Sequence, residues 1–130
     1  MASVNKLGVT KALLNNKLFS IKKGFLGLGT TMTYEPTSSK VNAYIIEYNN
    51  VDAERLERIL RMDKEKMVNE LAIADLKPQD MGNARFEMLK SEDGACFVIQ
   101  LYRFQDFSYR PVSDAIIIEG EAAATLAKIF

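Results

Sequence analysis

The spacing of hydrophobic positions changes along the chain and separates strand-like segments from helical ones. Apolar and polar residues alternate around Phe19–Lys22, and this period of two is typical of half-buried strands. Val41–Tyr48, which holds Tyr44, Ile45, Ile46 and Tyr48, is the strongest strand pattern of the first half. Beyond residue 50 apolar residues such as Leu56 and Leu60 recur at helical spacing. We expect helical structure over residues 52–74, as one helix or as two with a break near Asp63, with Asp52 or Asn50 as its N-cap. Strands are expected over residues 18–24, 25–34 and 41–48.

The second half repeats this order of strands and helix. Asp93-Gly94 predicts a hairpin turn, because such turns need a positive φ that glycine adopts freely. Gly120 is expected to open a terminal helix that has Leu126 on its apolar side. Strands are expected over residues 84–90, 96–104 and 107–119, the last as one strand or two. Residues before 17 fit either one helical turn capped by Thr10 or an irregular lead-in.

The ends of the two halves match each other. Ala43–Glu47 aligns with Ala115–Glu119 without a gap, and the apolar helix positions that follow align after a two-residue deletion. This match predicts an α+β fold made of a duplicated antiparallel β-meander-plus-helix unit, with helices packed on two sheets. The chain is then a single domain, with repeats over 17–62 and 84–130 joined by a helix and loop over 63–83. Convergent patterning of strand-to-helix junctions is the alternative.

A strand meander closed by a helix and occurring twice resembles the Whirly and transcriptional-coactivator type of single-stranded nucleic-acid-binding domain. The PUR repeat proteins are similar at this level. Whirly proteins carry the motif Lys-Gly-Lys-Ala-Ala-Leu, and the nearest segment here, Thr10–Leu14, lacks the glycine and the first lysine. Over residues 17–130 the resemblance implies helices bundled against two sheets, protomers that assemble into a homo-oligomer, and single-stranded DNA or RNA as the partner.

The distribution of charge agrees with a phosphate partner on one half of the molecule. The chain has 17 basic and 17 acidic residues, so its net charge is zero. Residues 1–50 nevertheless hold six lysines against two acidic residues, a net charge of +4, and the remainder carries −4. A neutral chain can thus present a basic face, although chance segregation of solvated charges explains the same numbers.

Single-strand binding also needs aromatic faces on which bases stack. On the strand that begins at Cys96 we expect Gln100, Tyr102 and Phe104 to face outward, opposite Phe97 and its apolar neighbours. The alternative is that these rings fill the core or an oligomer interface. The residues predicted to bind nucleic acid are Lys11, Lys17, Lys22, Lys23, Phe25, Tyr34, Lys40, Gln100, Tyr102, Arg103, Phe104, Tyr109 and Arg110.

The sequence offers no set of residues for catalysis or for a cofactor. It has no histidine, and its one cysteine, Cys96, is interpreted as a small buried hydrophobe. The glycines of Gly24–Gly29 precede a Thr-rich strand instead of a helix, so we do not interpret them as a nucleotide loop. We therefore expect a non-enzymatic, cytoplasmic protein with no metal, cofactor, small-molecule substrate or membrane partner. The rival hypothesis is an oligomeric protein-binding or inhibitory module that contacts its partner through the acidic half or the long helix.

Overall fold

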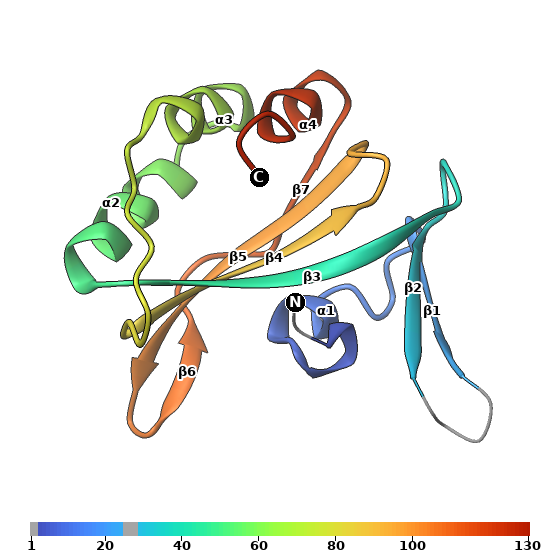
Figure 1. Ribbon diagram of the computed structural model, residues 1–130, viewed down its shortest axis with the longest axis horizontal. Coiled ribbons are helices and arrows are strands. Elements are labelled where there is room, and N and C mark those ends of the chain that lie inside the picture. Colours follow the sequence, from blue (N-terminus) through green and yellow to red (C-terminus); the bar gives the residue numbers. More distant parts are fainter. Residues whose placement is uncertain (1–2, 25–28) are drawn as a thin grey trace.

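The computed structural model describes residues 3–24 and 29–130, and it has an α+β fold in which helices pack on a curled antiparallel sheet (Figure 1). In chain order its elements are η1 (Val4–Lys6), α1 (Gly8–Lys11), β1 (Phe19–Lys23), β2 (Thr30–Tyr34), β3 (Ser39–Tyr48), α2 (Asn50–Leu60), α3 (Lys64–Ile73), β4 (Ala84–Ser91), β5 (Cys96–Gln105), β6 (Ser108–Pro111), β7 (Ile116–Glu119) and α4 (Gly120–Leu126). None of the described helices is long and apolar enough to cross a membrane.

The long strand β3 joins the two halves into one sheet. The strand order is β1-β2-β3-β4-β5-β6, and β7 pairs with β5 beside β6. β3 pairs with β2 only at Ser39 and Lys40, whereas it pairs with β4 over the whole of Val41–Tyr48. The β1–β2 hairpin therefore diverges from β3 after two paired residues and lies to one side of the rest of the sheet (Figure 1). One continuous sheet is present where two were expected, and the internal duplication stays a prediction.

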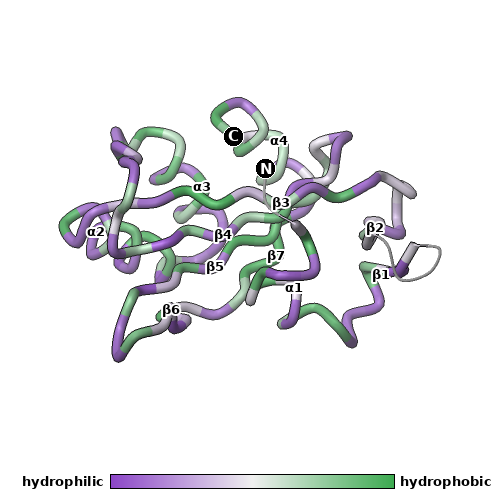
Figure 2. The backbone as a smooth tube through the Cα atoms, turned by 60° about the horizontal axis from the view of Figure 1, so that its bottom comes forward, coloured by the Kyte–Doolittle hydropathy of each residue, from purple (hydrophilic) through white to green (hydrophobic). Residues whose placement is uncertain are grey.

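Both faces of the central strands are buried, because different elements cover each face. On one face α2, α3 and α4 pack on residues such as Phe86, Phe97 and Leu101. On the other face the N-terminal segment and the β1–β2 hairpin enclose a second cluster that includes Val9 and Val98. Figure 2 shows hydrophobic residues along β7 and in the neighbouring centre of the sheet, beside α1.

The helix boundaries follow local capping bonds. Of the two alternatives for residues 52–74, the structure has two helices with a break near Asp63, whose carboxylate accepts a hydrogen bond from the Lys66 amide at 3.0 Å and so begins α3. The N-cap of α2 is Asn49, which accepts from the Asp52 amide at 2.9 Å, so the expectation of Asp52 or Asn50 is wrong. The predicted hairpin turn before β5 and the terminal helix opened by Gly120 are confirmed. Near the N-terminus the helical turn is Gly8–Lys11, inside which Thr10 lies, so Thr10 is not its cap.

Candidate functional site

The predicted nucleic-acid-binding lysines are exposed, and several lie at the end of the molecule that carries β1 and β2. Lys22 and Lys23 end β1, Lys40 lies near the start of β3, and Lys17 lies two residues before β1. Lys11 ends α1. Within residues 3–24 and 29–130 none of these ammonium groups forms an ion pair. The predicted Phe25 lies outside the described residues.

Two of the predicted stacking rings are buried instead of exposed. Tyr34 is 4% exposed, and its hydroxyl donates a hydrogen bond to Glu119. Tyr102 is 6% exposed, and its hydroxyl donates to Gln100 Oε1 at 2.6 Å, while Gln100 Nε2 donates to the Ser113 carbonyl at 3.1 Å. The outward orientation expected for Tyr102 and Gln100 is therefore wrong. The side chains of Tyr102 and Gln100 are hydrogen-bonded to each other in the interior, where bases and phosphates cannot reach them.

The reason for this burial is the N-terminal segment, which covers the second face of the sheet. Gly8 lies so close to the ring of Tyr102 that a Cβ at this position would collide with the hydroxyl. The next amide, that of Val9, donates to Glu87 Oε1 on β4 at 3.1 Å. Burial, followed by the nearby charge of Glu87, raises the pKa of Tyr102 to about 12. Contacts between α1 and this face decide which strand residues are exposed.

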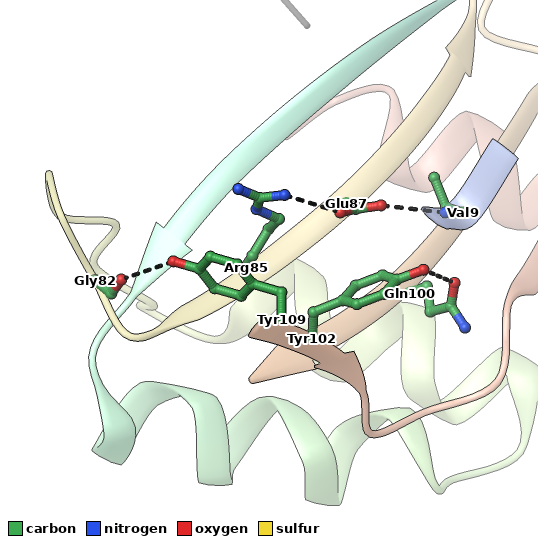
Figure 3. Close-up of polar contacts among 7 residues, drawn as sticks. All are labelled: Val9, Gly82, Arg85, Glu87, Gln100, Tyr102 and Tyr109. Atoms are coloured by element: carbon green, nitrogen blue, oxygen red, sulfur yellow. Dashed lines mark hydrogen bonds and ion pairs between the residues drawn. The ribbon is translucent and has the colours of Figure 1, made fainter. Parts of the chain in front are cut away.

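A chain of polar contacts leads from the buried Glu87 to the surface (Figure 3). Glu87 is 2% exposed, and its second carboxylate oxygen lies 3.5 Å from Arg85 Nη1. The guanidinium carbon of Arg85 lies 4.2 Å from the ring centroid of Tyr109 on β6, a cation–π arrangement. The Tyr109 hydroxyl donates to the Gly82 carbonyl at 3.3 Å. A buried carboxylate thus holds an arginine and a tyrosine in fixed positions at the edge of the sheet.

Beside this pair, large apolar side chains lie open to solvent on two adjoining turns. Phe107 is 97% exposed in the turn between β5 and β6, and Met81 is 93% exposed in the loop before β4. Phe104 is 52% exposed, and its ring meets the ring of Tyr109 edge-on at 5.3 Å between centroids. We call Met81, Phe104, Phe107 and Tyr109 the turn patch. A recess of about 370 Å³ opens within it, lined by Glu47, Met81, Gly82, Asn83, Phe104 and Tyr109.

The backbone that carries the turn patch is strained. The pairing of Gln105 with Ser108 leaves a two-residue turn, in which Asp106 has φ of 51° and Phe107 has φ of 67°. Such turns favour Asn-Gly, because a side chain with a Cβ pays about 1–2 kcal/mol in this region. Met81 also has a positive φ of 62°. Phe107 is 97% exposed, so little intramolecular packing compensates for this strain. Uncompensated backbone strain is typical of functional sites.

The two predicted arginines have different surroundings. Arg103 is on the helical side of the sheet, where Nη2 lies 3.4 Å from Glu57 of α2 and 3.4 Å from the Asn50 carbonyl. Arg110 is exposed on β6, and its nearest carboxylate is Asp106 at 4.0 Å. Arg103 therefore ties a helix to the sheet. Arg110 is its register partner on β6 and so points to the opposite face from Phe104 and Tyr109.

The described residues do not form the shared track of lysines and rings that the sequence predicted. Lys22, Lys23 and Lys40 belong to the β1–β2 end, and the exposed Phe104 and Tyr109 belong to the β5–β6 end (Figures 1 and 2). These ends lie on opposite sides of the molecule in both views. Stacking and phosphate binding would have to use separate surfaces.

Sequence reasoning missed Met81 and left Phe107 out of the predicted site. Each follows an aspartate in a turn, as Asp80-Met81 and Asp106-Phe107, and this repeated pair is the signal that was available. No group of carboxylate or thiol side chains in the described part of the chain could hold a metal ion. Cys96 is buried, and burial raises the pKa of its thiol to about 12. Comparison of the chain with models of protein families, with curated proteins and with solved structures finds no match.

Proposed function

We propose that this chain is a protein-binding module, and that the turn patch is the surface that contacts its partner. The observation that carries the proposal is the exposure of Met81 and Phe107 on two turns and of Phe104 near the end of β5. Contiguous apolar surface of this kind is uncommon on soluble proteins unless something binds there. Methionine, aromatic residues and arginine are also the residue types enriched at protein interfaces.

The turn patch is held in place before any partner arrives. The Phe104 amide donates to the Asn83 carbonyl at 3.0 Å, which fastens the two turns together. The bond from Tyr109 to Gly82 and the stacking of Arg85 on Tyr109 add two further links. Preorganised side chains lose less conformational entropy on binding, so more of their contact energy is expressed as affinity.

The charges next to the exposed side chains favour a protein over a lipid surface. Asp80 precedes Met81 and Asp106 precedes Phe107, so each apolar tip carries a carboxylate beside it. Anionic membrane surfaces attract basic segments and repel acidic ones. A protein surface with an apolar pocket and a basic rim suits such tips.

The proposal can be tested by crosslinking from the turn patch itself. A photoreactive phenylalanine derivative is placed at position 107, and a matched one at position 73, where Ile73 is 76% exposed on α3. We expect a protein adduct in the native host from position 107 and none from position 73. Absence of any protein adduct at 107, or equal adducts at both positions, would refute the proposal.

Single-stranded nucleic-acid binding is the second candidate function, supported by one face of the β1–β3 strands. Lys22 is the Cα partner of Thr31, and Thr33 is the partner of both Ser20 and Lys40. Directly paired residues point to the same face of a sheet, so two lysines and three hydroxyl groups share one surface. Such a surface supports phosphate contacts. Binding of this kind weakens as the salt concentration rises, because the release of counterions from the nucleic acid becomes less favourable.

A titration separates this candidate from the first. Labelled oligo-dT is titrated at low and high salt against the protein and against a variant with Lys22→Glu and Lys23→Glu. Tight binding at low salt that the variant loses would place the nucleic-acid function first. Absence of binding at low salt removes it. The Phe104→Ala variant serves as a control, because its ring lies at the other end of the sheet.

A further inference from the structure

We infer that the recess beside Phe104 and Tyr109 binds a methylated lysine side chain of the partner protein. The inference rests on the proposed function and names the chemical group that the partner presents. It follows from the aromatic walls of the recess, from the carboxylate of Glu47 and from the few hydrogen-bond acceptors that the recess offers.

Two aromatic rings line the recess. The ring planes of Phe104 and Tyr109 stand at 70° to each other, with 5.3 Å between the ring centroids. The exposed Met81 lines the same recess, which has about 370 Å³. Aromatic faces attract cations, and sites with several aromatic walls recognise quaternary and methylated ammonium groups. A cavity of about 150 Å³ is enough to hold benzene, so a dimethylammonium group, which is smaller, fits here with the end of its alkyl chain.

The carboxylate of Glu47 is fixed next to the Tyr109 ring through a single glycine. Glu47 Oε2 accepts a hydrogen bond from the Gly82 amide at 3.1 Å, and the Gly82 carbonyl accepts from the Tyr109 hydroxyl at 3.3 Å. A Cβ at position 82 would collide with the Tyr48 carbonyl, so glycine is the residue that lets the loop approach β3 this closely. The recess therefore combines aromatic walls with a positioned negative charge.

No cation of the described chain neutralises Glu47, which forms no ion pair there. Its register partner on β4 is Arg85, whose guanidinium lies 3.5 Å from the buried Glu87 instead. Glu87 balances Arg85, so the charge of Glu47 is left for a ligand. Because Arg85 already stacks on Tyr109, the half-exposed ring of Phe104 is the one that an incoming cation would contact.

The shortage of hydrogen-bond acceptors favours a methylated ammonium over an unmodified one. An unmodified lysine has three N–H donors, and each one that loses water without finding an acceptor costs free energy. The Gly82 carbonyl already accepts from Tyr109. The Asn83 carbonyl already accepts from the Phe104 amide at 3.0 Å. Dimethyllysine has one N–H, which Glu47 Oε1 can accept, and its methyl groups then contact the ring.

A titration followed through backbone amide chemical shifts tests the inference. The probe is the peptide acetyl-Gly-dimethyllysine-Gly-amide. The two comparison peptides carry unmodified lysine and a neutral isostere in which a CH group replaces the charged nitrogen. We expect the probe to shift the amide signals of Gly82 and Asn83, and to bind about two- to thirtyfold more tightly than either comparison peptide.

Variants of the recess test the assigned contacts. Phe104→Ala is expected to lower the affinity for the probe about two- to thirtyfold, the equivalent of one cation–π contact. Glu47→Gln keeps the shape and removes the charge, and it should lower the affinity about fivefold. Ile73→Ala and Glu65→Gln, both exposed on α3, are the matched controls and should bind the probe as the native chain does. Circular dichroism establishes that each variant is folded before it is compared.

The possible outcomes separate the inference from the proposed function. Equal affinity for the probe and for either comparison peptide overturns the inference, and so does binding that Phe104→Ala leaves unchanged. No binding of the probe at millimolar concentration, together with a protein adduct from position 107, overturns the inference and leaves the proposed function standing. Binding of the probe without any protein adduct overturns the proposed function, and with it the partner's lysine as the ligand.

Discussion

Replacing Phe107 with glycine is expected to make the protein more stable while removing the ring that we propose as its main contact residue. Phe107 has φ of 67° in a two-residue turn, a conformation that costs a residue with a Cβ about 1–2 kcal/mol. Glycine adopts it freely but adds about 0.5–1 kcal/mol of conformational entropy to the unfolded chain. The ring is 97% exposed, so its loss removes almost no buried area. The net gain in the free energy of unfolding, taken from the midpoints of these two ranges, is therefore about 0.75 kcal/mol.

Urea unfolding measures this gain. With a slope of about 1–3 kcal/mol per molar urea, the midpoint should rise by a few tenths of a molar. Phe107→Ala is the control, because it removes the ring but keeps the Cβ and hence the strain. It should leave the midpoint unchanged. A midpoint below that of the native chain for Phe107→Gly would show that the ring packs on the fold, and an equal gain from alanine would show that φ is not the cause.

Three further predictions concern the scaffold. Gly8→Ala should lower the free energy of unfolding by about 1–3 kcal/mol, since its Cβ collides with the buried Tyr102 hydroxyl; an unchanged urea midpoint would contradict this. Asn49→Ala should cost about 1 kcal/mol through loss of the α2 cap, and Asn50→Ala, which removes no capping bond, clearly less in the same assay. Burial raises the pKa of Cys96 from its usual 9 to about 12, so the neutral thiol is favoured in the folded state. Its contribution to stability is present below pH 9 and lost as pH rises toward 12, and Cys96→Ala should flatten this alkaline decline in urea midpoints measured across pH.

The features predicted correctly from sequence are those that depend on neighbouring residues. The break between α2 and α3 follows from Asp63, whose side chain caps the next helix within one turn. The hairpin between β4 and β5 follows from Gly94, which supplies a positive φ of 73°. Each of these decisions is made over about four residues, so the pattern of residue types contains the necessary information.

Burial on β5 could not be predicted in this way. Alternation assigned Gln100 and Tyr102 to solvent because they lie opposite Ile99 and Leu101 on the strand. In the folded protein the segment around Gly8 covers this face, more than 90 residues away in sequence, and the polar atoms find partners inside. Alternation identifies which residues share a face, but it does not say whether a distant segment covers that face.

The turn patch was missed through an error of one residue in the β5–β6 turn. The expected strand began at 107, which would make Phe107 a strand residue, whereas the strand begins at Ser108 and leaves Asp106-Phe107 as the whole turn. With the turn placed correctly, a phenylalanine occupies a position that favours glycine. Residues that break a local rule without compensating contacts are expected at functional sites. Met81 breaks the same rule in the loop before β4 and lines the recess together with Phe104 and Tyr109, so both departures fall next to the surface that we propose for binding.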